Sequence, residues 1–355
     1  MTKGNGVPAP SKGAAVSDEL RQDAQQYSAL RRLIKKDGLL DLQPAYYLYK
    51  VPFTLALLAA SLAILMLLGN SWLQLVNAAF MAFAFTQLGL LGHDAGHYQI
   101  FSSKKRNDFL FLLIGFLMSL VPSWWRDKHN AKHHRKPNQI GEDSDIDVSV
   151  LAFNEATALE KTGLHRFIVR HQAFLFYPVL FLASLSFLGA GIHHLLTSGK
   201  VRYPVVEPLA VAAHLAVYFA LLFILLDPWL AVLFFVVHHG LTGLYMGSVF
   251  APNHKGMPVL ERHQQMGFMT QQIITTRNLY SNPITDFVYG GLNYHIEHHL
   301  FPNMPRNNLK KAQKVVREFC RTHGFPYYET GVLQSQREIL AYLHKVSAPL
   351  RTSTA

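Results

Sequence analysis

The sequence has few charged residues and almost no cysteine. Its single cysteine, Cys320, excludes an intramolecular disulfide and any site built from paired cysteines, such as a zinc ribbon or an iron–sulfur cluster. Charged residues make up only 15% of the 355 positions, whereas 50% are hydrophobic. A metal site in this chain must therefore use nitrogen or oxygen ligands, and the composition is typical of a membrane protein.

Long stretches of the chain lack Asp, Glu, Lys and Arg altogether. Four of them, residues 51–69, 71–92, 208–226 and 228–252, are candidates for membrane spans. A hydrocarbon core about 30 Å thick needs roughly 20 apolar residues per spanning helix, so each stretch is long enough. Very short turns join them in pairs. The sequence therefore predicts an all-α membrane protein with four transmembrane helices in two hairpins and a cytoplasmic helical cap.

Two further uncharged stretches, 109–125 and 172–199, need separate treatment. Basic clusters flank the first at both ends, so we expect it to be re-entrant or to lie in the interface. The second is long enough to span, but a fifth span would put the last histidine group on the wrong side, so its role is left open. Basic residues flank the outer ends of both hairpins and are missing from both turns, which predicts that the termini and all histidine groups face the cytoplasm.

The chain divides into three predicted segments. Residues 1–45 form a polar cytoplasmic tail with an interfacial helix over 18–36, where apolar residues recur at helical spacing between basic ones. Residues 46–305 form the membrane domain, and residues 306–355 form a cytoplasmic C-terminal segment. The net charge of +11 favours anionic partners such as membrane lipids, and we expect no nucleic-acid binding.

Eight of the 19 histidines fall into three tight groups. Helix positions three and four apart share a face, so each group can aim two or three imidazoles at one point. Eight imidazoles exceed what one four-coordinate zinc ion uses, which favours a dinuclear site. We expect the neighbouring acids, Asp94 and Glu297, to orient ligands by accepting a ring N–H. The groups are His93 and His97; His129, His133 and His134; and His295, His298 and His299.

These groups resemble the three histidine boxes of the membrane fatty acid desaturases. They read His-Asp-Ala-Gly-His at 93–97, His-Asn-Ala-Lys-His-His at 129–134 and His-Ile-Glu-His-His at 295–299. The stretches 137–147 and 290–302 are similar to the branch that contains front-end acyl desaturases. Front-end members usually carry Gln where this chain has His295, so the resemblance does not give the position of the new double bond.

The resemblance implies a centre of two iron ions that uses O2 to remove two hydrogens from adjacent methylenes, leaving a cis double bond and water. It also implies a fatty acyl substrate, carried by CoA or by a lipid. The sequence contains no His-Pro-Gly-Gly heme motif, so we expect a separate ferredoxin or cytochrome b5-type electron donor. Opposite charge would guide an acidic donor to a basic surface. The predicted surface includes Lys104, Lys105, Arg126, Lys128 and Arg135.

The resemblance further implies a ninth histidine from near the end of the fourth span. His238 and His239 fall near mid-membrane, whereas His254 follows that span at its cytoplasmic end. On a helix, His239 and His254 would stand about 22 Å apart, so both cannot reach one site. We predict that His254 is the ligand and that Asn253 holds water beside it. The role of the two mid-membrane histidines is left open.

Other functions compete with this interpretation. An acyl or lipid hydroxylase, ketolase or acetylenase on the same scaffold would differ only in the fate of the substrate, which motifs do not reveal. A membrane zinc hydrolase would use His93 and His97 as a zincin-like pair, but would leave at least five clustered histidines unexplained. A histidine-lined transporter would carry ionisable residues at mid-membrane, whereas these groups lie at span ends or in basic loops.

Overall fold

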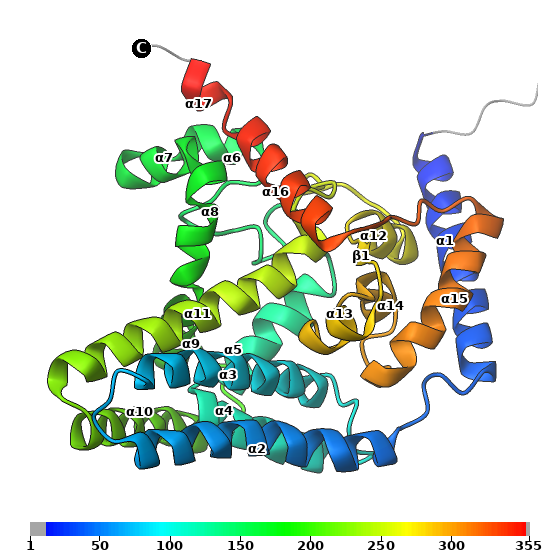
Figure 1. The fold of residues 1–355 in the computed structure, drawn as a ribbon. Helices are drawn as coiled ribbons and strands as arrows, with labels where there is room; N and C mark the ends of the chain where they lie inside the picture. The colour runs from blue at the N-terminus through cyan, green and yellow to red at the C-terminus, as the bar shows by residue number, and fades with distance from the viewer. Residues whose placement is uncertain (1–11, 353–355) are drawn as a thin grey trace, which may run out of the picture.

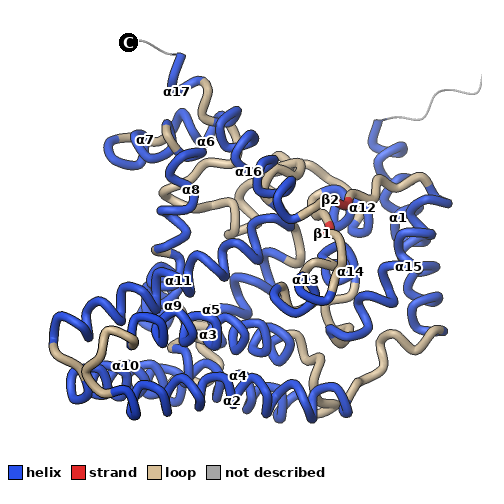
Figure 2. Tube along the Cα trace, in the orientation of Figure 1, coloured by secondary structure: helices blue, strands red, loops and turns tan. Residues whose placement is uncertain are grey.

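The computed structural model describes residues 12–352, and the regular structure in this part of the chain is almost entirely helical (Figures 1 and 2). Its one sheet has two short parallel strands, β1 (Asn278–Leu279) and β2 (Glu329–Thr330). The all-α prediction is confirmed. Residues 1–11 of the predicted tail lie outside the described residues.

Four helices are long and apolar enough to cross a membrane, as predicted. They are α2 (Pro44–Leu68), α3 (Gln74–Gly96), α10 (Val206–Leu225) and α11 (Pro228–His254). The turns of the two hairpins lie side by side, because Asn70 Nδ2 donates to Asp227 Oδ2 at 2.5 Å and the Asp227 amide donates back to Asn70 Oδ1 at 2.9 Å. The two hairpins therefore run in the same direction and carry their open ends to one side.

The two remaining apolar stretches form bent helix pairs. One consists of α4 (Lys104–Met118), followed by α5 (Pro122–Trp125) and the π-helix η1 (Arg126–His133), with a bend of 112°. The other consists of α8 (Gln172–Phe181) and α9 (Ala183–Thr197), with a bend of 67°. At 1.5 Å per residue, neither α8 nor α9 alone reaches the roughly 30 Å of a hydrocarbon core.

The α8–α9 bend packs tightly against α11 at a glycine. A Cβ atom built on Gly240 would stand 1.8 Å from the Phe181 ring, which leaves no room for any side chain. Small residues at such positions let helices approach closely in a membrane. Gly240 therefore fixes where the bent pair crosses the fourth span.

The cap is built from helices at the open end of the hairpins (Figure 1). Besides η1, it contains α1 (Lys12–Lys36), α12 (Phe268–Ile274), α13 (Pro283–Val288), α14 (His295–Leu300) and α15 (Arg306–His323). Beside α8 lie α6 (Glu155–Glu160), α7 (Gly163–Arg170), α16 (Val332–Val346) and α17 (Pro349–Thr352).

The predicted interfacial helix differs from what the structure shows. Leu30 and Ile34 of α1 are fully buried, in one apolar core with Met269 of α12 and Val316 of α15. Figure 1 shows α1 alongside α15. The apolar face of α1 therefore packs on the cap rather than on lipid, because the cap offers a complementary apolar surface that sequence periodicity does not reveal.

Candidate metal centre

All nine predicted histidines converge at the open end of the hairpins. His93 lies in the last turn of α3 and His97 directly follows that helix, while His254 ends α11. The others are carried by η1 and its next residue and by α14. They form two sets, and within each set the ligand nitrogens all lie within 4.8 Å of one another. Group A is His93, His97, His129, His134 and His298; group B is His133, His254, His295 and His299.

The second and third histidine boxes are each divided between the two groups, contrary to the expectation that one box aims at one point. η1 is a π-helix in which the His134 amide donates to the His129 carbonyl at 2.9 Å, so residues five apart come together. His129 and His134 therefore enter group A and His133 enters group B. On α14, His295 and His299 share a face four residues apart, while His298 points to the other group.

The nitrogen spacing fits bound metal ions. His254 Nε2 lies 3.1, 2.8 and 3.0 Å from the Nε2 atoms of His133, His295 and His299. A neutral imidazole has only one N–H, so hydrogen bonds cannot account for three such contacts. Ligand nitrogens about 2.1 Å from an ion and at right angles to each other would stand about 3 Å apart. The same spacing joins His129 Nε2 to His93 and His134 Nε2, at 3.2 and 3.1 Å.

Six histidines of the site are held neutral. Burial, with neighbouring imidazoles as a further cause, lowers the pKa of these rings well below the usual histidine value, so each keeps a lone pair for a metal. This applies to His97, His129, His134, His295, His298 and His299.

Two side chains that sequence reasoning missed orient group B. His133 Nδ1 lies 3.0 Å from Asp143 Oδ2 and 3.1 Å from Oδ1, and His299 Nδ1 donates to Gln272 Oε1 at 2.8 Å. The carbonyls of Thr275 and Leu292 accept from His254 and His295 Nδ1 at 3.0 and 3.2 Å. With the proton held on each outer nitrogen, all four Nε2 lone pairs point inward. One feature of the sequence could have identified Asp143, namely its position within residues 137–147, the stretch that is similar to front-end acyl desaturases.

Two of the three residues predicted to support the ligands, Asp94 and Glu297, contact other partners instead. Asp94 forms an ion pair with Arg306 Nε at 2.8 Å, and its 3.9 Å separation from His93 Nδ1 is too long for a hydrogen bond. Glu297 accepts from Tyr327 Oη at 2.6 Å and Asn278 Nδ2 at 2.7 Å, because its position on α14 points it into the cap. The third residue, Asn253, is buried and donates to the Val249 carbonyl at 3.0 Å, while its Oδ1 accepts no hydrogen bond from the described residues, so its water-holding role stays a prediction.

An aromatic side chain closes group A on one side. The Trp125 ring centroid lies 5.6, 5.4 and 4.5 Å from those of His93, His97 and His129. It packs directly on the backbone of Gly96, where a Cβ atom would stand 2.4 Å from the indole. The glycine of the first box therefore lets a large apolar ring exclude water from the imidazoles.

The mid-membrane histidines stand apart from both groups. His238 Nδ1 lies 2.8 Å from Tyr218 Oη, and His239 Nδ1 lies 3.0 Å from Ser184 Oγ. His239 also lines a small cavity between α3, α9, α11 and the end of α4. The other lining residues are Phe85, Met118, Ser119, Leu120, Ser184, Phe187, Leu188, Thr242 and Met246.

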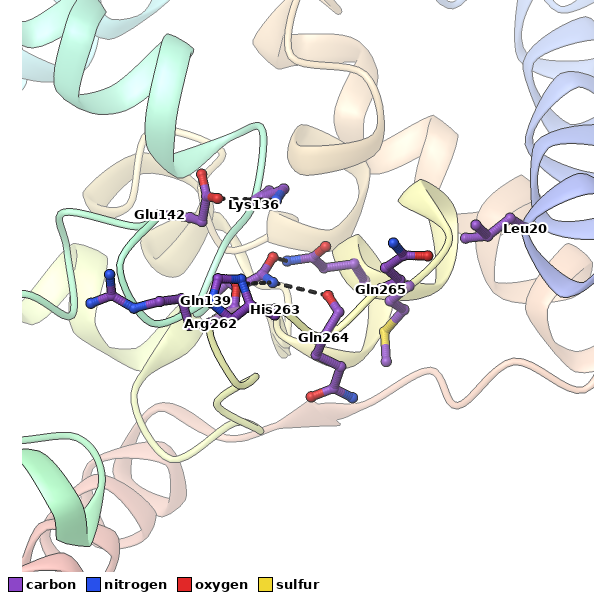
Figure 3. A pocket seen from close by; sticks show the side chains of 10 residues that line it. Leu20, Lys136, Gln139, Glu142, Arg262, His263, Gln264 and Gln265 are labelled. Atoms are coloured by element: carbon purple, nitrogen blue, oxygen red, sulfur yellow. Dashed lines mark hydrogen bonds and ion pairs between the residues drawn. The ribbon is translucent and has the colours of Figure 1, made fainter. Parts of the chain in front are cut away.

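A polar cleft opens on the cap between α1 and the loops that follow η1 and α11 (Figure 3). Gln139 at its floor donates to the carbonyls of Glu261, Arg262 and Gln264 at 3.1, 3.3 and 2.9 Å. The cleft contains none of the nine histidines. Its lining residue Gln271 precedes Gln272, so the cleft wall and the support of His299 belong to the same helix, α12.

Comparisons with known proteins agree with the geometry. Residues 70–331 match the family model described as fatty acid desaturase. The chain is 32% identical over 336 residues to an acyl-lipid (9-3)-desaturase of Physcomitrium patens, covering 91% of this chain and 63% of that protein. It is 33% identical over 320 residues to a Delta(6)-fatty-acid desaturase of Caenorhabditis elegans, covering 85% and 70%. A Delta(8)-fatty-acid desaturase of Euglena gracilis is 30% identical over 330 residues, covering 88% and 76%. The chain thus spans less than two thirds of the Physcomitrium relative.

Proposed function

Because the chain belongs to the fatty acid desaturase family, we propose that it introduces a cis double bond into a fatty acyl chain with O2 as the oxidant. The observation that carries this proposal is the convergence of nine buried imidazoles in two adjacent groups. The substrate gives up two hydrogens, a donor supplies two electrons, two protons come from water, and O2 leaves as two water molecules.

We infer that groups A and B each hold one iron ion. When bound, the two ions supply the O2 activation that breaking an unactivated C–H bond requires. The protein supplies the rest. Asp143 and Gln272 fix His133 and His299, which keeps their lone pairs directed inward. Trp125 covers three group A imidazoles and so shields the reacting carbons from water.

The acyl chain needs an apolar route into the membrane part of the molecule. Six of the ten residues that line the cavity beside His239 are apolar, and Phe85 and Met246 each precede a predicted ligand on the same helix by about 12 Å. Its volume of about 30 Å³ is too small for an acyl tail, so we infer that it widens to take the part of the chain beyond the reacting carbons. Its place between spans suits an acyl tail rather than a headgroup.

Expression in a host membrane tests the activity. We expect new cis double bonds in the host acyl chains, located by mass spectrometry, and none with the variant His134→Ala, which removes one imidazole of group A. Products with an added hydroxyl or keto oxygen, and no new double bond, would replace the proposal with the hydroxylase or ketolase alternative.

We propose that the open end of the hairpins, with both histidine groups, faces the cytoplasm. The support is the basic residues at that end and their lack in the turns near residues 70 and 227. A cysteine introduced at the exposed Asn70 should react with an impermeant thiol reagent only from the far side, and one at Lys311 only from the cytoplasmic side. Labelling of position 70 from the cytoplasm would refute this orientation.

A separate one-electron donor is part of the proposal, but its predicted docking surface needs correction. Arg126 Nη2 lies 2.6 Å from Asp108 Oδ1, and Lys128 pairs with Asp145. Lys128 is therefore compensated within the protein, whereas Arg126 shares its carboxylate with Arg202. Lys104, Lys105 and Arg135 stay exposed.

A further inference from the structure

The residue after the ligand candidate His97 has an unusual backbone. Tyr98 has φ of 59°, in the left-handed region that a bulky residue rarely adopts, and its amide donates to the Ala95 carbonyl at 3.1 Å. This turn ends α3 and leaves the Tyr98 side chain half-buried, whereas the residues on either side of it are buried. Strain of this kind persists only where the surroundings hold it in place.

Three cations surround the Tyr98 ring. The Lys104 ammonium lies 5.9 Å and the Arg126 guanidinium 5.0 Å from the ring centroid. Arg202 Nη1 donates to Tyr98 Oη at 3.1 Å. The three come from α4, η1 and the segment before α10, so the tertiary structure assembles this arrangement from separate parts of the chain.

The surface around Tyr98 carries excess positive charge. One buried carboxylate, Asp108, compensates both Arg126 and Arg202, at 2.6 and 2.7 Å. Within residues 12–352, no ion pair involves the neighbouring exposed cations, which are Lys104, Lys105, Arg106 and Lys200. We call these four residues, with Arg126, Arg202 and Tyr98, the Tyr98 surface. Its charge complements an acidic partner.

The Tyr98 surface is also connected directly to group A. Tyr98 is joined by one peptide bond to His97, and Arg126 follows Trp125, whose ring packs on three group A imidazoles. The polar cleft of Figure 3 has mixed charge, because Glu142 lies among its basic residues and pairs with Lys136 at 3.2 Å. Of the two, the Tyr98 surface offers both the charge and the shorter covalent route.

We propose that the Tyr98 surface is the docking site of a small acidic one-electron carrier, and that electrons enter group A through Tyr98 and His97. Each encounter oxidises the carrier by one electron and reduces the metal centre by one electron, with no proton or group transferred. Two encounters supply the two electrons of the desaturation reaction. The inference rests on the proposed function and adds its partner and point of entry.

Binding is tested without any turnover. The full chain, metal-free and iron-loaded, is placed in phosphatidylcholine nanodiscs, and the acidic soluble haem domain of a cytochrome b5 is the probe. The double variant Lys104→Glu/Lys105→Glu should weaken binding about tenfold or more at low salt and flatten its salt dependence. The matched variant Lys311→Glu/Lys314→Glu, with the same charge change on exposed α15 positions, should bind as the native chain does. Equal binding by both double variants overturns the docking site.

Electron entry is tested by mixing the reduced haem domain with the iron-loaded chain and following haem oxidation. At saturating carrier, Tyr98→Leu should slow the first-order phase of haem oxidation at least about tenfold with unchanged iron content. Tyr98→Phe, which keeps the ring, should restore most of the rate.

Photoreduced deazaflavin, a neutral reductant, serves as the reference. If deazaflavin yields no double bond in native protein, the proposed function fails. If deazaflavin does yield a double bond, and neither Tyr98 variant changes the rate of haem oxidation, only the proposed electron route through Tyr98 fails. If the variant Lys104→Glu/Lys105→Glu binds the haem domain normally and differs from the native chain only in its binding to anionic lipid, the Tyr98 surface is a lipid-binding surface instead.

Discussion

His254→Ala should lower the iron content from about two ions per chain to about one and abolish desaturation. His254 Nε2 is the atom on which group B converges, within 3.1 Å of three other imidazole nitrogens. Removing a partner that only orients a ligand already costs about 10- to 100-fold in metal affinity or activity, so loss of a ligand should cost at least that much. Metal analysis of purified protein and product analysis of the same membranes measure the two effects.

His239→Ala is the matched control, because it removes an imidazole from the same helix. His239 contacts Ser184 and belongs to neither histidine group. We expect this variant to keep both iron ions, and its effect should be confined to how substrates bind, since His239 lines the cavity proposed for the acyl tail. Full iron content and normal turnover in the His254 variant would show that this residue is not a ligand.

Arg306→Met should lower the free energy of unfolding by about 3–5 kcal/mol, the usual cost of leaving one member of a buried ion pair without its partner. Arg306 is 6% exposed and lies 2.8 Å from Asp94, which is 2% exposed, and it also donates to the Leu90 carbonyl. Asp94 would keep only neutral donors such as Tyr47, at 3.1 Å. Denaturation in detergent, followed by the near-ultraviolet signal, gives the comparison with native protein.

The double variant Asp94→Asn/Arg306→Met separates charge from packing. With both charges removed, most of the lost stability should return, because apolar or neutral replacements of a complete buried pair are often close to neutral. A double variant as unstable as Arg306→Met would show instead that the arginine acts by filling space. If this ion pair holds the end of α3 in place beside His93, iron content should also be lower in Arg306→Met than in the double variant.

The sequence was sufficient for features that depend on local pattern. The length of an apolar stretch decides whether a helix can span, and the short turns pair the spans, so the four helices and both hairpins were predicted correctly. Helical spacing within each box likewise brought out eight of the nine histidines that the structure gathers into two groups, and the family resemblance implied the ninth. Position along one helix was enough to prefer His254 to His239.

Contacts between distant parts of the chain were decided only by the tertiary structure. The division of a box between two groups depends on the π-helical winding of η1, which differs from the α-helical spacing assumed from sequence. Adjacent acids such as Asp94 and Glu297 looked like supports for the ligands, yet Asp143 and Gln272 occupy that role. The pairing of Asp94 with Arg306 and the cations around Tyr98 have the same origin. Helical periodicity determines which face a side chain occupies, but its partner across that face depends on how remote elements pack.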